Sequence, residues 1–203
     1  SLNTWSQLES RFERSLRLIL GIFHEYEQKA TFFWLGWLAE RHPYLVRTCQ
    51  DLGHEIASHG YAHVLAYEVG QKGFREDIRK SKVILEDIIG APVYGFRAAG
   101  FSTLNETTWT FEEVAAAGYS YDSSVFPASR GHGGMSLSPL VPHVIDTVAG
   151  PLVEFPQSVV SVAGRRFSLF GGGYLRMAPR ALIRWGCRRL ARDSRPLIVY
   201  LHP

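Results

Sequence analysis

Residues 53–63 read Gly-His-Glu-Ile-Ala-Ser-His-Gly-Tyr-Ala-His and hold the most informative pattern of the chain. The short run at 55–58 predicts a strand, and His59 and His63 follow it directly, four residues apart. Neutral imidazole is a good ligand for Zn²⁺ and related divalent ions, and this spacing can aim two rings at one ion. The segment therefore predicts a strand whose end carries part of a metal site.

Predicted strands and helices alternate along the rest of the chain. Apolar runs predict further strands at 30–35, 93–97, 119–121, 152–155 and 197–201, with two short ones inside 158–170. Helical spacing of apolar residues predicts helices near 4–23, 43–52, 74–88 and 105–118, and a last one from Pro179 onward. A Gly/Ser/Pro-rich loop is expected at 123–143 and a turn at 171–173. The alternation predicts an α/β fold with a parallel sheet or barrel.

Polar side chains stand where this architecture builds its active sites, at the C-terminal ends of strands. His59 follows one predicted strand, Arg97 ends the next, Asp122 follows a third and His202 follows the last. This coincidence strengthens the metal hypothesis. His54, which precedes its strand, is expected to be structural instead.

The composition limits the class of protein. A hydrophobic fraction of 46% and an aromatic fraction of 13% are typical of a folded globular chain. A net charge of +3 is too small to indicate a nucleic-acid partner, and no apolar run reaches the roughly 20 residues of a membrane span. Cys49 and Cys187 are expected to be unpaired thiols. No signal peptide is evident, so the compartment stays open between bacterial cytoplasm and periplasm.

Seven segments resemble, in order, the NodB-homology polysaccharide deacetylases of carbohydrate esterase family four. The similarity is greatest to the branch associated with exosortase (PEP-CTERM) and exopolysaccharide loci. The segments are Ala30–Phe33, Gly53–His63, Gly95–Ala98, Tyr121–Ser124, Glu154–Pro156, Gly171–Tyr174 and Val199–Pro203. The resemblance implies an irregular (β/α)7–8 barrel. It also implies a metal-dependent hydrolase that removes N-acetyl groups from N-acetylhexosamine-containing polysaccharides.

The resemblance also implies residue roles. His59 and His63 match the metal histidines, with Zn²⁺ as the implied ion. Arg97 matches the arginine that holds the catalytic carboxylate, and His202 matches the general acid of the last strand. A backbone N–H within 98–100 is expected to stabilise the oxyanion.

This sequence departs from the family pattern in two ways. The family opens with a strand ending in two aspartates, one a metal ligand and one the general base, and nothing here matches it. The chain starts at Ser1 inside a helix signal and stops just after a predicted strand. We therefore expect residues 1–203 to be a single, incomplete domain lacking the first strand, inactive alone, with the third ligand, an Asp, upstream of Ser1. The arginine motif also has Ala99 where the family has proline, which leaves that loop looser.

Several side chains near the predicted strand ends could contact a glycan. The substrate-binding candidates are Tyr61, Phe101, Asp122, Glu154 and Tyr174, with Trp109 and Phe126 as further aromatic candidates.

Four arginines recur at a spacing of four on the last predicted helix: Arg180, Arg184, Arg188 and Arg192. One interpretation is a solvated outer face. The other is attraction to an anionic glycan or to lipid headgroups at a membrane surface.

Two other functions stay open at this point. The chain could be a catalytically silent glycan-binding module of the same fold, or a related amidohydrolase acting on a small amide. The first differs from the enzyme in lacking the aspartates, and the second differs only in its substrate.

Overall fold

The computed structural model describes residues 11–129 and 134–202. The predicted start of the first helix, with Thr4 and Gln7, lies outside the described residues.

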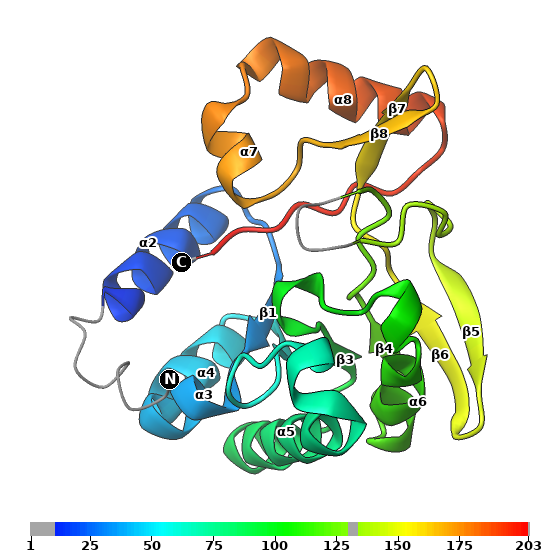
Figure 1. Cartoon of the computed structure of the whole chain (residues 1–203). Coiled ribbons are helices and arrows are strands. Elements are labelled where there is room, and N and C mark those ends of the chain that lie inside the picture. The colour runs from blue at the N-terminus through cyan, green and yellow to red at the C-terminus, as the bar shows by residue number, and fades with distance from the viewer. Residues whose placement is uncertain (1–10, 130–133, 203) are drawn as a thin grey trace.

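Among the described residues, a six-stranded sheet forms the centre of the molecule, in the order β1-β2-β3-β4-β6-β5 (Figure 1). Its strands are β1 (Thr31–Trp34), β2 (Glu55–Ser58), β3 (Gly95–Phe96), β4 (Tyr121–Asp122), β5 (His143–Thr147) and β6 (Gly150–Glu154). Neighbours from β1 to β6 run parallel, and β5 pairs antiparallel with β6. The predicted α/β class is confirmed, whereas the β5–β6 hairpin was not predicted.

Helices cover one face of this sheet. They are α3 (Gly36–Arg41), α4 (Pro43–Asp51), α5 (Ala66–Ile89) and α6 (Trp109–Ala116), with 3₁₀ turns η1 (Ala99–Phe101) and η2 (Asn105–Thr107). The main core lies between them and the sheet, where Ile56, Phe96 and Leu152 of the strands join Phe74 and Leu85 of the helices. Full burial of each such side chain stabilises the fold by about 1.5–3 kcal/mol.

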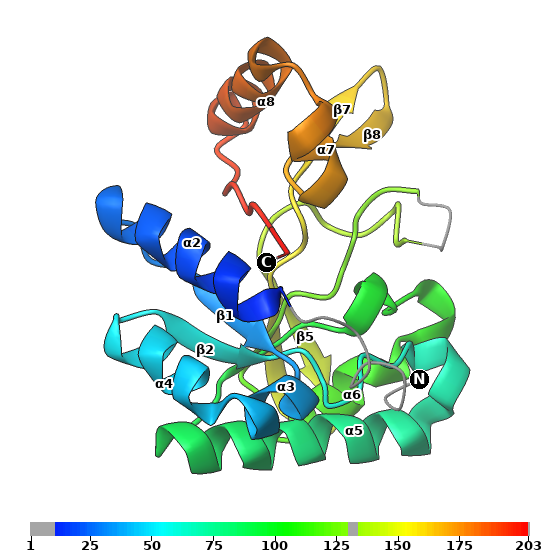
Figure 2. The same cartoon turned by 90° about the vertical axis from the view of Figure 1, so that its left-hand side faces the viewer.

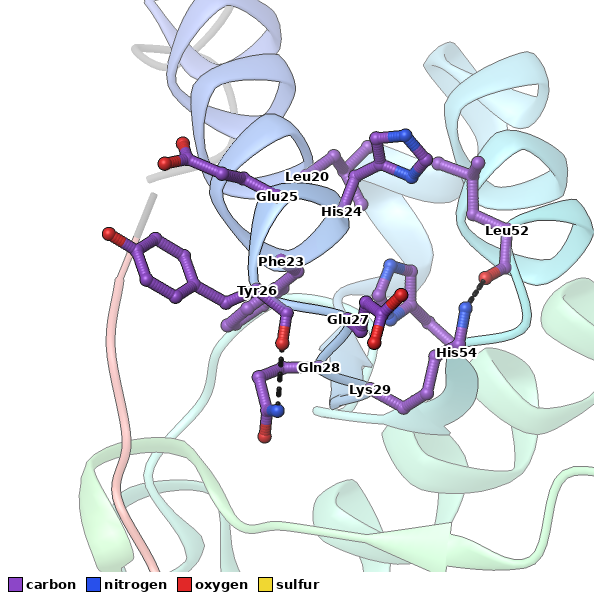
Figure 3. A pocket seen from close by; sticks show the side chains of 10 residues that line it. All are labelled: Leu20, Phe23, His24, Glu25, Tyr26, Glu27, Gln28, Lys29, Leu52 and His54. Carbon is purple, nitrogen blue, oxygen red and sulfur yellow. Dashed lines mark hydrogen bonds between the residues drawn. The ribbon is translucent and has the colours of Figure 1, made fainter.

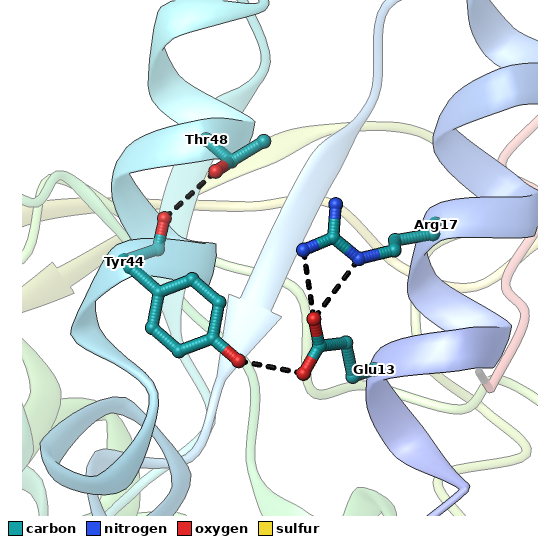
Figure 4. Close-up of polar contacts among 4 residues, drawn as sticks. All are labelled: Glu13, Arg17, Tyr44 and Thr48. Atoms are coloured by element: carbon teal, nitrogen blue, oxygen red, sulfur yellow. Dashed lines mark hydrogen bonds and ion pairs between the residues drawn. The ribbon is translucent and has the colours of Figure 1, made fainter.

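Helix α2 (Phe12–Glu25) lies beside β1 and α4 (Figure 2). The ring of Phe12 meets Trp34 edge-on at 5.5 Å, and Leu16 and Leu20 are buried. At the surface, the hydroxyl of Tyr44 donates to Oε2 of Glu13 at 2.6 Å, while Arg17 bonds Oε1 at 2.7 Å (Figure 4). The apolar contacts hold this helix in place, because exposed ion pairs contribute little.

The last quarter of the chain forms a separate layer at the far end of the molecule from α5 (Figures 1 and 2). It contains the hairpin β7 (Val159–Val162) and β8 (Arg165–Ser168), then α7 (Gly172–Met177) and α8 (Arg180–Arg192). Val160, Phe170 and Leu190 form a small core of their own. The two short strands expected in 158–170 are confirmed.

Two predictions for this layer are wrong. Residues 171–173 do not form a simple turn, because α7 begins at Gly172. Residues 197–201 do not form a strand: only Tyr200 pairs, in a single parallel bridge with Gly171. The backbone of Tyr200 donates to Phe170 O and accepts from Gly172 N, each at 3.0 Å. One partner residue supplies too few hydrogen bonds for a ladder, so the apolar run stays extended without one.

Candidate functional site

A groove of about 1330 Å³ runs along the face of the sheet that α3–α6 leave uncovered. Its walls come from α2, the ends of β1–β4, α7 and residues 197–202. All four predicted catalytic and metal-binding residues line it: His59, His63, Arg97 and His202. Residues far apart in sequence thus meet at one edge of the sheet.

The loop after β2 is held from two sides. The N–H groups of Gly36 and Trp37, at the start of α3, donate to the carbonyls of Gly60 (2.9 Å) and Tyr61 (3.1 Å). From α5, the carboxylate of Asp77 accepts from Tyr61 N at 2.7 Å and from Ala62 N at 2.9 Å. These bonds fix the backbone between the two histidines.

The conformation of this loop is unusual. Gly60 has a φ of +77°, and a Cβ there would lie 2.5 Å from Oδ2 of Asp77. His63 itself has a φ of +54°, in the left-handed region that few non-glycine residues adopt, although Asn, Asp and His adopt it more often than the others. A strained histidine at the mouth of a groove is typical of a functional position.

Asp77 is the positioning residue that the sequence did not reveal. It lies in the middle of α5, where a carboxylate between charged neighbours looks like part of a solvated face. Burial raises its pKa, and the two backbone N–H donors oppose that shift. No motif or spacing in the sequence connects it to residues 59–63.

The two histidine rings suit a common ion. Nδ1 of His59 lies 2.6 Å from the carbonyl oxygen of Arg97. A carbonyl only accepts, so Nδ1 carries the hydrogen and Nε2 keeps its lone pair. The ring centroids of His59 and His63 are 5.2 Å apart. Two imidazoles bound to one tetrahedral Zn²⁺ at about 2.0–2.1 Å have centroids about 5 Å apart.

Burial lowers the pKa of His59 to about 3, so the imidazole is neutral, as a metal ligand must be. Within residues 11–129 and 134–202, however, no group of three His, Cys, Asp or Glu side chains is placed to hold an ion. The described residues therefore offer two ligands of a shell that needs at least three.

Arg97 projects into the groove from the end of β3. Its Nη2 donates to Oγ of Ser123 at 2.8 Å and its Nε to Ser123 O at 3.1 Å. The guanidinium lies 4.1 Å from the ring centroid of Phe33. Burial lowers the pKa of Arg97 to about 10, which leaves it charged at neutral pH, with Asp122 and Glu154 favouring the charge.

Asp122 and Glu154 do not reach the groove. Both are fully buried and neither lines the groove, so the structure does not bring these two predicted substrate-binding residues together with the others. Oδ1 of Asp122 accepts from Ser123 N (2.9 Å) and from Ser124 Oγ, and Oε1 of Glu154 accepts from Val125 N (2.9 Å). These bonds brace the loop that follows β4.

The other oxygen of each carboxyl group is buried without a hydrogen-bond donor: among the described residues, neither Oδ2 of Asp122 nor Oε2 of Glu154 has a partner. Burial raises the pKa of Asp122 to about 6, and burial and the Asp122 charge raise that of Glu154. Because both environments favour the neutral form, the pair tends to hold a proton that two separate carboxylates would release.

His202 reaches the groove from the extended C-terminal segment. Its ring lies 6.1 Å from that of Tyr200, which contacts Phe101 at 5.1 Å. Burial lowers the pKa of His202, and the positive charges of His63 and Arg97 lower it further. A Cβ on Gly171 would lie 1.9 Å from the ring of Tyr200, so glycine is required there.

The aromatic candidates fall into two groups. Phe101 and Tyr174 line the groove, and Tyr174 is 52% exposed. Tyr61 points elsewhere: its hydroxyl donates to Glu40 at 2.9 Å, and Lys80 lies over its ring. Trp109 and Phe126 pack in hydrophobic clusters and do not line the groove.

The expected oxyanion contact also changes. The N–H of Ala98 donates to Oγ of Ser124 at 2.7 Å, so it is already engaged in holding the two loops together.

A second hollow, of about 640 Å³, lies beyond the C-terminal end of α2 (Figure 3). His54 forms its floor, with Nδ1 accepting from Ala30 N at 3.3 Å and the ring packed against Phe23 and Phe32. Lys29 crosses it to the carbonyl of Leu52. These contacts give His54 a structural role.

Two family models together account for nearly the whole chain. The polysaccharide deacetylase model matches residues 11–121, and a domain of unknown function, DUF3473, matches residues 123–203. The boundary between them falls at the end of β4.

Curated relatives match the first part. A peptidoglycan-N-acetylglucosamine deacetylase of Bacillus cereus is 32% identical over 101 residues, 50% of this chain and 46% of the relative. A second one is 33% identical over 96 residues, 47% of this chain and 35% of that protein. The matches thus span less than half of each relative.

Solved structures extend the similarity to the whole fold. A Mycobacterium smegmatis structure assigned to the polysaccharide deacetylases has a TM-score of 0.67 at 23% identity, covering 93% of this chain and 63% of that one. The Puue allantoinase gives 0.60 at 21%, covering 94% and 59%. A family-four pseudoenzyme from Bacillus anthracis gives 0.53 at 15%, covering 95% and 51%. At such identities only the (β/α)-barrel type of fold is established by the likeness. With more than half of its length matched by the family model, the chain belongs to the polysaccharide deacetylase family.

Proposed function

We propose that this protein is a metal-dependent N-deacetylase acting on a polysaccharide that contains N-acetylhexosamine. The observation that carries the proposal is the His59–His63 pair, whose rings have the separation that one ion requires, in a chain of this family. The curated relatives act on peptidoglycan N-acetylglucosamine, which supports the substrate class. An exopolysaccharide is the specific substrate that the sequence resemblance suggests.

In this proposal His59 and His63 hold a Zn²⁺ ion, and a carboxylate from outside the described residues completes the shell. The bound ion supplies a Lewis acid that polarises the acetamide carbonyl and acidifies a water molecule. The Arg97 carbonyl keeps Nε2 of His59 unprotonated and available to the ion.

The side chain of Arg97 has a different task. Ser123 and Phe33 hold its guanidinium in the groove, where a fixed positive charge would orient the carboxylate that takes the proton from water. That carboxylate is also expected from outside the described residues.

His202 is the proposed general acid, giving a proton to the departing amine. Its present surroundings favour the neutral ring, since burial and nearby positive charges lower its pKa. A carboxylate brought into the groove would raise the pKa again and allow the ring to be protonated. Phe101 and Tyr174 are placed to contact the sugar rings.

One observation favours a second candidate, a glycan-binding module without catalysis. Within the described residues the metal shell has two ligands, which is too few for tight binding. The two functions differ in whether the protein releases acetate.

The test uses the protein expressed from its complete gene, with N-acetylglucosamine oligomers as substrate. We expect acetate release that chelation abolishes and Zn²⁺ restores, and a loss of at least about 100-fold on His59→Ala. His24→Ala is the matched control, because that histidine is exposed and outside the groove lining. Release that survives the chelator contradicts the metal proposal. Glycan binding without acetate release favours the silent module, and release only from small cyclic or linear amides favours an amidohydrolase.

A further inference from the structure

The charge of this chain is divided unevenly along its length. Residues 155–192 contain eight arginines and no Lys, Asp or Glu. They hold eight of the chain's 22 basic residues, which leaves 14 basic against all 19 acidic residues elsewhere. The net charge of +3 therefore combines a strongly basic segment with an acidic remainder. Such asymmetry indicates a surface that meets an anionic partner.

The structure concentrates this charge on one layer. The segment builds β7, β8, α7 and α8, which lie together at the end of the molecule away from α5 (Figures 1 and 2). Helix α8 packs inward through Gly186 and Leu190, against Val160 and Phe170. Its opposite face carries the exposed arginines: Arg180, Arg184, Arg188 and Arg192.

In the part of the chain that the structure describes, Arg180, Arg184, Arg188 and Arg192 form no ion pair with a nearby carboxylate. Among the described residues α8 shows one ion pair, between Arg189 and Asp193 at 3.3 Å. Like charges at a spacing of four destabilise an isolated helix slightly. The repulsion among Arg180, Arg184, Arg188 and Arg192 therefore lowers the stability of α8 in water. Contact with anions would remove this repulsion.

Apolar side chains stand among the charges. Trp185 is 43% exposed, Leu182 is 40% exposed, and Met177, the last residue of α7, is 87% exposed. A helix that presents Trp and Leu among many arginines has the composition of one lying in a membrane interface. A soluble polyanion, such as an acidic glycan, would leave these apolar groups in water.

We propose that α8 docks this protein on an anionic phospholipid surface. The arginines contact lipid phosphates, which guanidinium groups bind with two hydrogen bonds each. Trp185 and Leu182 enter the boundary between headgroups and acyl chains, and Met177 lies beside them. No helix in the described part of the chain is long and apolar enough to cross a bilayer. Attachment by this helix would be peripheral and reversible.

The test is co-sedimentation of the complete protein with vesicles of phosphatidylcholine, alone or with about one third phosphatidylglycerol. We expect binding only to the vesicles with phosphatidylglycerol, weakening as salt rises. Each arginine near an anionic surface contributes about fivefold in affinity, so Arg184→Glu plus Arg188→Glu should weaken binding at least about 25-fold. Trp185 fluorescence should shift to the blue on binding and be quenched by brominated lipid, and Trp185→Phe should remove that change.

Matched variants make the result specific. Lys72→Glu plus Arg79→Glu imposes the same charge change on the exposed side of α5 and should leave binding unchanged. Arg184→Lys plus Arg188→Lys keeps the charge and should retain most of the binding, which shows that the helix is still folded. Equal binding of wild type and the α8 reversal overturns the proposal, as does equal binding to both kinds of vesicle. Binding to an acidic polysaccharide but not to vesicles assigns the surface to glycans and also overturns it.

Discussion

Nδ1 of His59 lies 2.6 Å from the backbone carbonyl of Arg97, so the residue after β3 orients the residue after β2. The same residue sends its side chain to Ser123, after β4. Arg97 thus has two separable tasks: its backbone fixes the tautomer of His59, the proposed metal ligand, and its guanidinium places a positive charge in the groove.

A substitution of the Arg97 side chain should separate these tasks. Arg97→Met keeps the carbonyl and the apolar stem, so Zn²⁺ affinity should stay within about threefold of wild type. We expect kcat for acetate release to fall at least about 100-fold, because the carboxylate that takes the proton is no longer oriented by the guanidinium. Metal titration by calorimetry and steady-state kinetics measure the two effects. A large loss of metal affinity in this variant, similar to that of His59→Ala, would show that the backbone contact alone does not hold the ring.

Asp77 should matter for metal binding although it contacts neither histidine ring. Asp77→Asn replaces one acceptor by an amide donor facing a backbone N–H, which frees the loop at 61–62. We expect Zn²⁺ affinity to fall about 10- to 100-fold, the range seen when a residue that holds metal ligands in position is changed. Asp87→Asn, at an exposed site on the same helix, serves as control and should have no effect. An unchanged affinity in Asp77→Asn would mean that α3 alone sets the loop.

His63 should contribute to ion binding while its left-handed backbone conformation lowers the free energy of unfolding of the metal-free protein. His63→Gly relieves the left-handed conformation and should raise the free energy of unfolding of the metal-free protein by up to about 1 kcal/mol, while metal binding is lost. His24→Gly, inside α2, should have the opposite sign and cost about 1 kcal/mol. Urea unfolding with and without Zn²⁺ measures both. A destabilised His63→Gly protein would argue that ring contacts outweigh the backbone strain.

The Asp122–Glu154 pair predicts a pH dependence of stability. The folded chain keeps a proton with a pKa of about 6 on Asp122, whereas an unfolded aspartate releases it near its ordinary value of 3.8. More protons are bound in the folded state between about pH 4 and 6, so this contribution to stability is full below pH 4 and is lost as pH rises through that window. At about 1.4 kcal/mol per pKa unit, a shift of about two units corresponds to a loss of about 3 kcal/mol.

Glu154→Gln should reduce that dependence, because it removes the Glu154 proton while burial still raises the pKa of Asp122. The amide carries no titrating proton, and its oxygen can still accept from Val125 N. Relative to wild type, the variant should lose less free energy of unfolding between pH 4 and pH 8. Denaturation at both pH values measures the difference, and Asp122→Asn should behave alike. Parallel stability profiles for wild type and both variants would rule out a shared proton.

The sequence predicted those parts of the fold that depend on local pattern. The strand at 55–58 was predicted with the bounds that β2 has, because a short apolar run ends at a histidine. Helix α3 was not predicted, because it is short and begins at Gly36, and its start is held by hydrogen bonds to residues 60 and 61. The β5–β6 hairpin was also not predicted, since its outer strand is half exposed and not continuously apolar.

The site was less accessible to prediction than the fold. The histidine pair was predicted from its residue type and spacing, and Arg97 was predicted from its place at the end of a strand. The role of Asp77 could not be predicted from the sequence, because its carboxylate reaches the loop after β2 only when α5 packs against that loop. Asp122 and Glu154 follow the right strands but do not line the groove, because residues one apart in a strand face opposite sides of the sheet.

Gly171 contributes to this site because it has no side chain. Its missing methyl group is the space that the Tyr200 ring occupies, and Tyr200 leads directly to His202. An alanine at 171 would therefore displace His202, the proposed proton donor, which is thirty-one positions away, without touching it. When variants of this protein are ranked by the chemistry of the altered residue, such a change would look harmless. The space available at each position is a better guide to the effect of a substitution. At Gly171 the absence of a Cβ atom is what allows Tyr200, and with it His202, to take its place.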